Sequence, residues 1–198
     1  MRTIVVGATG TLGQATVSAL KQNHEIIKAS RKEDIRVDLS IPESIKKMYA
    51  QVSDIDAVVC TAGDATFGPF ASFSDDDFVF SLGNKLMGQI NLVRYGGEHI
   101  NTGGVFTLTT GVLAHSPNAA TVMLTMINRG LEAFVEAAAL DMPKNQRLNA
   151  VCPPMAKETA EKMGWGPGGV PAAEIAQYYV QSLESNLNGA LIGPAHSD

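Results

Sequence analysis

The 198-residue sequence has little of the chemistry that marks several common classes of protein. It contains two cysteines and one tryptophan, and charged residues make up only 18% of it. Cys60 and Cys152 end apolar, strand-like segments, so we interpret them as small buried residues of a reducing compartment rather than a disulfide, metal ligands or nucleophiles. The net charge of −5 and the pI of about 5.3 argue against a nucleic-acid surface.

Long apolar runs are also absent. No run approaches the length that spans a membrane, and residues 1–6 lead directly into an expected strand with no room for a signal peptide. We therefore expect a cytoplasmic protein that binds neither membranes nor nucleic acids. Apolar residues are nevertheless plentiful, at 45%, and the length suits one substantial core. The sequence predicts a single domain over 1–198.

The clearest pattern lies in the first segment of the chain. A strand-like run at 3–6 meets a glycine-spaced turn, Gly7-Ala-Thr-Gly10-Thr-Leu-Gly13, and a helix-forming segment at 14–21 follows directly. This order is typical of a dinucleotide-binding fold, in which the glycines permit a sharp turn, close approach of a pyrophosphate and close helix packing. Amides at the helix start would hold the phosphates, helped by the hydroxyls of Thr9 and Thr11. The alternative is a glycine-rich turn without a ligand.

The second predicted strand, 25–29, ends in a basic pair where this fold usually carries an acidic residue for the ribose of NAD. Arg31 and Lys32 occupy that place. A guanidinium can pair bidentately with a 2′-phosphate, so the sequence favours NADP(H) over NAD(H). The alternative is that the two side chains only solvate a turn. Asp38, a few residues later, is placed to reach the adenine amine.

Strand-like and helical segments alternate along the rest of the chain, with no internal repeat and no linker. Continuous apolar runs such as 55–60 are typical of strands buried on both faces of a parallel sheet. The pattern predicts an α/β protein with a doubly wound parallel sheet, a Rossmann fold whose ligand lies at the carboxyl ends of the strands. Further strands are expected at 35–39, 103–110, 147–151 and 190–192, and further helices at 43–52, 74–95, 119–141 and 172–185.

The segment 155–171 differs from its surroundings. It follows Pro153 and Pro154, is rich in glycine and proline, and holds the single tryptophan, Trp165. Its length and composition suggest a lid over the site. Such a lid would set the substrate, but its sequence has no pattern that identifies one.

Together, these segments resemble the short-chain dehydrogenase/reductase family over essentially the whole chain. The glycine turn resembles the cofactor motif of the extended and atypical members, and Asp38-Leu39 resembles the adenine-contacting pair. Thr61-Ala62-Gly63 is similar to the family's Asn-Ala-Gly, and Arg147-Leu-Asn-Ala-Val-Cys-Pro153-Pro154 is similar to the segment beside the nicotinamide. The resemblance implies an NADP(H) site formed by Gly7, Thr9, Gly10, Thr11, Leu12, Gly13, Arg31, Asp38, Leu39, Ala62, Gly63, Asn128 and Pro153.

The resemblance fails at the family's Tyr-x-x-x-Lys motif. In the family the tyrosine protonates the carbonyl, while the lysine lowers the tyrosine's pKa and binds the nicotinamide ribose. Alignment of the fifth helix puts Leu124 at the tyrosine and Asn128 at the lysine. Between Tyr95 and Lys144 the sequence contains neither tyrosine nor lysine. Leu124 cannot donate a proton, whereas Asn128 can still hydrogen-bond the ribose without a charge.

Three residues are candidates to orient the substrate or to supply the proton that the absent tyrosine would donate. Thr110 falls at the family's catalytic serine and would orient the substrate, or it is simply a threonine at a strand end. Asn84 matches the asparagine that holds a proton-relay water in the family, or it marks a helix distortion. His115, in the loop after the strand, titrates near neutral pH and is a candidate acid, or it is an ordinary loop histidine.

The other histidines indicate no metal site, because His24, His99 and His196 are scattered without metal-ligand spacing. Assembly is suggested by the long helix 119–141. Small residues on this helix permit close packing against the same helix of a second copy of the chain, as in the family. The alternative is that these residues only pack on the sheet of their own chain. We expect a homodimer or homotetramer; the small residues are Gly130, Ala133, Ala137 and Ala138.

Two functional hypotheses follow. The first is an NADP(H)-dependent oxidoreductase acting on a small carbonyl or alcohol substrate, in which the cofactor carries the hydride and water or a substitute group supplies the proton. The second is a catalytically weak or inactive NADP(H)-binding module, such as a redox sensor or a partner-binding protein. We favour the first hypothesis.

Overall fold

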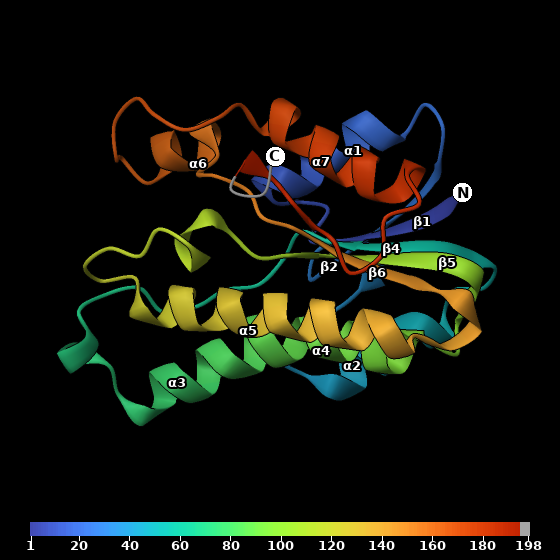
Figure 1. The fold of residues 1–198 in the computed structure, drawn as a ribbon, viewed down its shortest axis with the longest axis horizontal. Coiled ribbons are helices and arrows are strands. Elements are labelled where there is room, and N and C mark those ends of the chain that lie inside the picture. The colour runs from blue at the N-terminus through green and yellow to red at the C-terminus, as the bar shows by residue number, and fades with distance from the viewer. Residues whose placement is uncertain (195–198) are drawn as a thin grey trace.

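A seven-stranded sheet forms the middle layer of the computed structural model, which describes residues 1–194 (Figure 1). All neighbouring strands pair in parallel, in the order β3-β2-β1-β4-β5-β6-β7. The order reverses direction beside β1, so β1 and β4 flank the point where ligands bind in sheets of this kind. The strands are β1 (Arg2–Val6), β2 (Glu25–Ser30), β3 (Ile35–Arg36), β4 (Ile55–Cys60), β5 (Ile100–Thr109), β6 (Arg147–Val151) and β7 (Leu191–Ile192).

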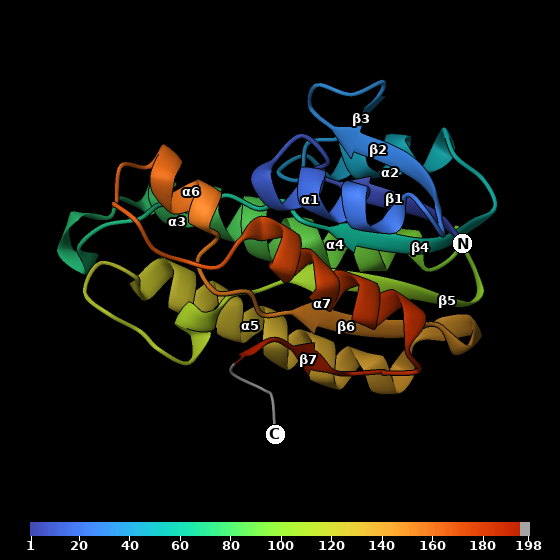
Figure 2. The same ribbon diagram turned by 90° about the horizontal axis from the view of Figure 1, so that it is seen from above.

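Helices cover both faces of this sheet (Figures 1 and 2). On one face α1 (Thr11–Leu20) packs beside α7 (Ala172–Glu184), with the short α6 (Lys157–Lys162) beyond the carboxyl ends of the strands. The opposite face carries α2 (Pro42–Ala50), α3 (Asp75–Ser81), α4 (Gly88–Gly96) and α5 (Val122–Ala138). Within the described residues, no helix combines the length and the apolar character needed to cross a membrane.

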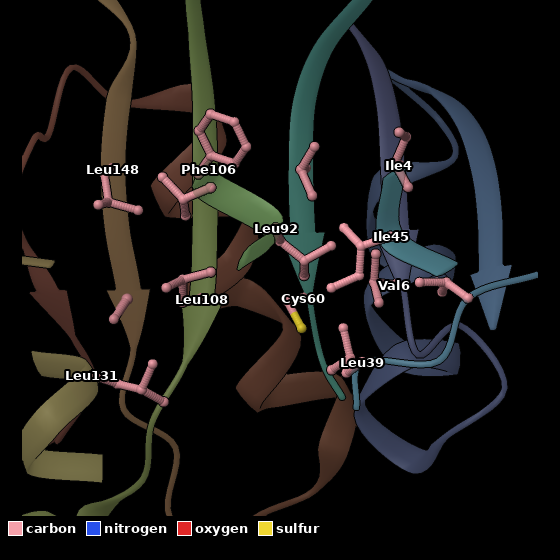
Figure 3. Close-up of a cluster of buried hydrophobic side chains, with 14 of the residues drawn as sticks. Ile4, Val6, Leu39, Ile45, Cys60, Leu92, Phe106, Leu108, Leu131 and Leu148 are labelled. Atoms are coloured by element: carbon pink, nitrogen blue, oxygen red, sulfur yellow. The ribbon is translucent and has the colours of Figure 1, made fainter. Parts of the chain in front are cut away.

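The core is divided by the sheet because successive strand residues point to opposite faces. Ile4 and Val6 of β1 pack toward α2, α4 and α5, whereas Val5 packs toward α1 and α7. Figure 3 shows the first of these clusters, in which Phe106, Leu108 and other side chains of four strands meet residues of the covering helices. This burial on both faces explains the continuous apolar runs of the strands.

The predicted fold class is confirmed. Strands β4 and β6 have the predicted bounds. The predicted helix at 74–95 begins as expected, because the Ser74 side chain accepts a hydrogen bond from the amide of Asp77 and the Asp77 carboxylate accepts one from the amide of Ser74. The chain remains helical to Gly96, but between α3 and α4 it forms a π-helical turn, η2 (Leu82–Met87).

The bounds of two expected segments are corrected by the structure. The strand predicted at 35–39 ends at Arg36, because the Asp38 amide donates to Ser44 Oγ and the Asp38 carboxylate accepts from Ser40, which turns the chain toward α2. The helix predicted from residue 119 begins at Val122, after a turn closed by Thr121 Oγ1 on the Asn118 carbonyl. Four short turns of helix complete the elements: η1 (Phe70–Ser72), η3 (Val112–Ala114), η4 (Ala139–Asp141) and η5 (Pro143–Asn145).

The segment 155–171, predicted as a lid, contains the helix α6. Both ends of this segment are joined by backbone hydrogen bonds, from Lys157 N to the Val170 carbonyl and from Val170 N to the Met155 carbonyl, each 2.9 Å. The segment is therefore a closed loop with an ordered base. On this loop, the Trp165 ring lies 5.9 Å from the ring of Phe67, which belongs to the loop after β4.

Candidate functional site

Two cavities adjoin at the carboxyl ends of the central strands. The first, of about 290 Å³, lies against the glycine turn and the ends of β1 and β2. The second, of about 340 Å³, lies at the ends of β5 and β6. Thr61, Ala62 and Gly63, directly after β4, line both cavities. A long ligand can therefore occupy the first cavity and present one end to the second.

The glycine turn has a geometry that side chains would obstruct. Gly7 has a φ of +83°, and a Cβ there would lie 2.8 Å from the Cβ of Ala62. At Gly13, a Cβ would overlap the carbonyl oxygen of Gly7, so the absence of a side chain sets the packing of α1 on β1. Helix α1 begins after Gly10 with no side-chain cap and no acidic residue in its first turn. Its first amides thus fit an anion such as a pyrophosphate, with Gly7, Thr9 and Gly10 lining the cavity.

The far end of the first cavity is basic. Arg31 and Lys32 line it, on a turn formed where Ser30 Oγ accepts hydrogen bonds from the amides of Lys32 and Glu33. The Arg31 guanidinium lies 3.9 Å from the carboxylate of Asp64, and both side chains are mostly exposed. An exposed pair of this length is weak, so Arg31 can turn to a phosphate at little cost. Predicted residues Asp38 and Leu39 also line this cavity.

The second cavity contains a buried polar atom suited to a ribose. Asn128, which is 3% exposed, lines the cavity, and its Nδ2 lies 3.4 Å from the Gly111 carbonyl oxygen. Its Oδ1 is buried without a hydrogen-bond partner among the described residues. A ligand hydroxyl would satisfy this atom. Leu124, one turn of α5 earlier, lines the same cavity, as do Leu12 and Pro153.

Thr110 lines the second cavity above a buried acidic group. Its Oγ1 lies 3.4 Å from Oε1 of Glu132 on α5, a residue that is 2% exposed. The other carboxylate oxygen, Oε2, lies 2.9 Å from Nε2 of His115 and 3.7 Å from the Arg129 guanidinium. Cys152 Sγ approaches Oε1 at 3.3 Å, and burial raises the pKa of this thiol to about 11. The histidine is therefore held by a carboxylate behind Thr110.

These contacts bring together residues that sequence spacing left apart. One possible metal-ligand atom from each of His115, Glu132 and Cys152 lies within 4.8 Å of the other two. Histidine, glutamate and cysteine are residue types that bind metal ions such as zinc. Within this group, Nε2 of His115 and Oε2 of Glu132 lie 2.9 Å apart, within the distance of an ion pair. Of the other histidines, His24 contacts Thr3 and His99 stacks on Tyr49, while His196 lies outside the described residues.

Asn84 is engaged by the backbone. Its Oδ1 accepts a hydrogen bond of 2.8 Å from the amide of Asp64, which fixes the loop after β4, and the residue lines the first cavity. The next residue, Lys85, lines the second cavity. Sequence reasoning missed Lys85, although it stands beside a predicted site residue.

A second lysine that the sequence did not reveal lies over the glycine turn. Lys162 of α6 donates a hydrogen bond of 2.9 Å to Oγ1 of Thr11, at the first residue of α1. Its charge therefore stands beside the amides that fit an anion. The residues are 151 positions apart, so only the fold could bring them together.

A doubly wound parallel sheet with a glycine turn at its switch point is the architecture of the Rossmann class of α/β folds. Residues 3–181 match a family model described as enoyl-(acyl carrier protein) reductase. This match covers most of the chain, and the protein belongs to the short-chain dehydrogenase/reductase family. A comparison with curated proteins finds no match.

Solved structures extend this comparison. The protein lin1944 from Listeria innocua is 37% identical, with a TM-score of 0.92 over 96% of this chain and 98% of that one. A small-chain dehydrogenase in complex with NADPH is 23% identical, with a TM-score of 0.87 over 97% of this chain and 95% of that one. A short chain dehydrogenase from Burkholderia cenocepacia in complex with NADP is 17% identical, with a TM-score of 0.83 over 96% and 94%. At these lower identities the likeness shows the fold.

Proposed function

We propose that this protein is an NADP(H)-dependent oxidoreductase acting on a small carbonyl or alcohol substrate. The observation that carries the proposal is the pair of adjoining cavities that share Thr61, Ala62 and Gly63. One cavity has the features of a dinucleotide site and the other has room for a small molecule. A cofactor extended across both would meet the substrate at their junction.

The first cavity supplies the residues that would hold the cofactor. The amides that follow Gly10 would bind the pyrophosphate, Arg31 and Lys32 the 2′-phosphate, and Asp38 the adenine amine. Asn128 would accept a hydrogen bond from the nicotinamide ribose in the second cavity. When bound, the nicotinamide supplies or accepts a hydride. The NADPH and NADP complexes of the structural neighbours support this choice of cofactor.

The second cavity supplies the substrate site. Its lining is largely apolar, including Leu12, Leu113, Leu124 and Met155, which favours a small compound with little charge. Thr110 is the hydroxyl placed to orient the substrate oxygen, as the sequence suggested. We retain Asn84 as a positioning residue, through its hydrogen bond to the Asp64 amide, and His115 as a candidate acid behind Thr110.

One observation favours a second function. Leu124 and Asn128 line the cavity at the positions aligned with the family's tyrosine and lysine, and neither side chain can donate a proton to a carbonyl. A protein with such a site would bind NADP(H) without turning it over, as a sensor or a partner-binding module.

A single assay separates the two functions. NADPH oxidation is followed with a panel of small aldehydes and ketones, while NADPH binding to the same preparation is titrated. We expect binding together with turnover of at least one carbonyl compound; without any group that replaces the missing tyrosine, the rate would be lower by about 10²–10⁴, the usual cost of losing an acid catalyst. Tight binding with no turnover across the panel would select the sensor function, and absence of NADPH binding would contradict both.

A further inference from the structure

The second cavity contains a cation in a largely apolar wall. Lys85 lines the cavity together with Thr110 and Leu124, and the residue is only 7% exposed. A lysine buried to this extent is uncommon unless it is paired or functional. No carboxylate lies within ion-pair distance of Lys85 among the described residues, whose salt bridges involve other groups. The structure therefore maintains an ammonium group beside the proposed substrate site without a neutralising partner.

Local geometry holds this lysine in place. It belongs to the π-helical turn η2, which turns both Asn84 and Lys85 inward, and such turns occur frequently at functional sites. Its stem passes over Gly63, where an added Cβ would lie 2.9 Å from the Lys85 Cγ. The glycine after β4 thus makes room for the lysine.

The ammonium group has unused hydrogen-bonding capacity. Nζ lies 3.4 Å from the carbonyl oxygen of Thr109, the last residue of β5. Gln89 already binds that carbonyl at 2.9 Å, so the contact of Lys85 is the longer of the two. An ammonium group has three donors. Two of them remain for a ligand in the cavity, next to the Thr110 position that would receive the substrate oxygen.

Two titratable groups face Lys85. Burial lowers its pKa, while the Cys60 thiol of β4 and the Asp64 carboxylate after β4 act weakly in the opposite direction. The pKa of Cys60 is itself raised to about 12 by burial, so this thiol remains neutral near pH 7. Lys85 is thus a stronger acid than an exposed lysine, which suits it to proton transfer.

We propose that Lys85 is the proton donor that replaces the family's tyrosine in this protein. The inference rests on the proposed function and assigns a role within the same site. In carbonyl reduction, a bound nicotinamide would supply the hydride of the new C–H bond, and the carbonyl π electrons would move to oxygen. The oxygen takes a proton from Nζ to form the O–H bond, and the neutral amine regains a proton from solvent. In alcohol oxidation, the neutral amine would take the O–H proton, the O–H electrons would form the carbonyl π bond, and the C–H hydride would pass to the oxidised cofactor.

Other groups at the site are less suited to this role. Thr110 can hydrogen-bond the oxygen, but a hydroxyl is too weak an acid to protonate it unaided. His115 is not among the residues that line the second cavity, and its Nε2 lies 2.9 Å from the carboxylate of Glu132.

The first test needs neither cofactor nor turnover. The protein is incubated near pH 8 with 4-nitrobenzaldehyde and sodium cyanoborohydride, which reduces any imine formed with a lysine to a stable secondary amine. Peptide mass spectrometry then measures the labelling rate of each lysine. We expect Lys85 to be labelled faster than the exposed Lys47 of α2, because its neutral fraction is larger and the aldehyde can occupy the cavity. Labelling of Lys47 without labelling of Lys85 would overturn the proposal.

The second test measures catalysis with NADPH and 4-nitrobenzaldehyde. Lys85→Met should lower kcat by about 10²–10⁴ and leave the Kd for NADPH within about twofold. Lys85→Arg keeps the charge but cannot release a proton at ordinary pH, so it should remain as slow as Lys85→Met. Ethylammonium added to Lys85→Ala should restore part of the rate. Lys47→Met is the matched control, since Lys47 is exposed and lines neither cavity.

The outcomes are distinguishable. Wild-type turnover that survives in Lys85→Met, or returns in Lys85→Arg, would overturn the role of Lys85 while the oxidoreductase function stands. Loss of the pH dependence of kcat in His115→Gln, with Lys85→Met unaffected, would assign the proton to the histidine. A wild-type protein that labels at Lys85 but reduces no carbonyl compound would contradict the proposed function itself.

Discussion

At the scale of single residues, a substitution of Thr110 distinguishes an effect on turnover of the substrate from an effect on cofactor binding. Its Oγ1 lies 3.4 Å from the Glu132 carboxylate and from the Val151 carbonyl oxygen, and it also hydrogen-bonds the Cys152 thiol. Because Thr110 lines the second cavity, its hydroxyl can also reach the oxygen of a substrate there. Thr110→Val should lower kcat roughly 2- to 10-fold, the worth of one neutral hydrogen bond, and leave NADPH affinity unchanged. Steady-state kinetics and a binding titration check this.

The matched control for this change is Thr102→Val. Thr102 is exposed near the opposite, amino end of β5, so the same substitution there should alter neither quantity. A Thr110→Val protein with full kcat would show that the position of the family's serine has no catalytic role in this chain.

The burial of Lys85 leads to a prediction about how the free energy of unfolding depends on pH. Burial lowers its folded-state pKa below the ordinary 10.5, so the fold disfavours the charged form. The loss of folding stability that comes from burying the charged lysine is fully present below the folded-state pKa. It disappears as the pH rises through 10.5, above which the lysine is neutral in both the folded and the unfolded protein. Lys85→Met should therefore be more stable than wild type near pH 7, and the difference should shrink toward pH 10. Urea unfolding measures it, and a difference independent of pH would contradict the assignment.

Residues of the candidate site were predictable where they are close in the sequence. Gly7, Gly10, Arg31 and Asp38 all follow the first strands, and all line the first cavity. Lys85 was not predictable, because its place in the cavity depends on a π-helical turn that no residue pattern announces. The same holds for the contact between His115 and Glu132, which only the packing of α5 creates.

At the scale of elements, the junction of β1 and α1 depends on Gly13. A Cβ there would overlap the Gly7 carbonyl oxygen, and backbone atoms on both sides resist displacement. Gly13→Ala should destabilise the protein by about 1–3 kcal/mol, as overpacking of a tight contact typically does. Chemical denaturation at fixed pH gives this value.

A glycine elsewhere provides the comparison. Gly83 lies in η2, and an added Cβ would meet no atom within 4 Å apart from its chain neighbours and its own helical backbone, so Gly83→Ala should be neutral or stabilising by about 0.5–1 kcal/mol. Equal effects of the two substitutions would show that the close approach at Gly13 is not what holds α1 on the sheet.

The bounds of a strand or helix were predicted best where a single residue pattern, such as a continuous apolar run, determines the local structure. Strand β4 is buried on both faces, and its apolar run 55–60 matched its bounds. The segment 35–39 looked like a strand for the same reason, but hydrogen bonds of Asp38 with Ser40 and Ser44 end it early. The closed loop 155–171 could not be derived, because its base consists of backbone hydrogen bonds that no side-chain pattern encodes.

At the scale of the whole molecule, α5 presents an uncovered apolar stripe. Val122 and Met126 are each 43% exposed, and Ala133 and Ala137 follow on the same side of the helix. Gly130 does not belong to this stripe, since its Cβ position lies 3.4 Å from Leu86 of η2 in the same chain. The small residues of α5 are therefore divided between internal packing and an exposed face.

We expect this face to pair with a second copy of the chain, giving a homodimer or homotetramer. Small exposed residues permit the close approach of two helices, and the exposed apolar side chains would be buried in the process. Light scattering at micromolar concentration should give a multiple of the 20.9 kDa chain mass, and Ala133→Arg should reduce it to the monomer. A monomeric wild-type protein would contradict this prediction.

The central claim is that the first cavity is an NADP(H) site with Arg31 at the 2′-phosphate. Calorimetric titration of NADPH and NADH into the same preparation tests it most directly. A charge-assisted pair contributes about 1.5–3 kcal/mol, so NADPH should bind roughly ten- to a hundredfold more tightly, and Arg31→Asp should reverse the order. Lys47→Asp, on exposed α2, should leave both affinities unchanged. Equal wild-type affinities for NADPH and NADH, or binding of neither, would contradict the claim.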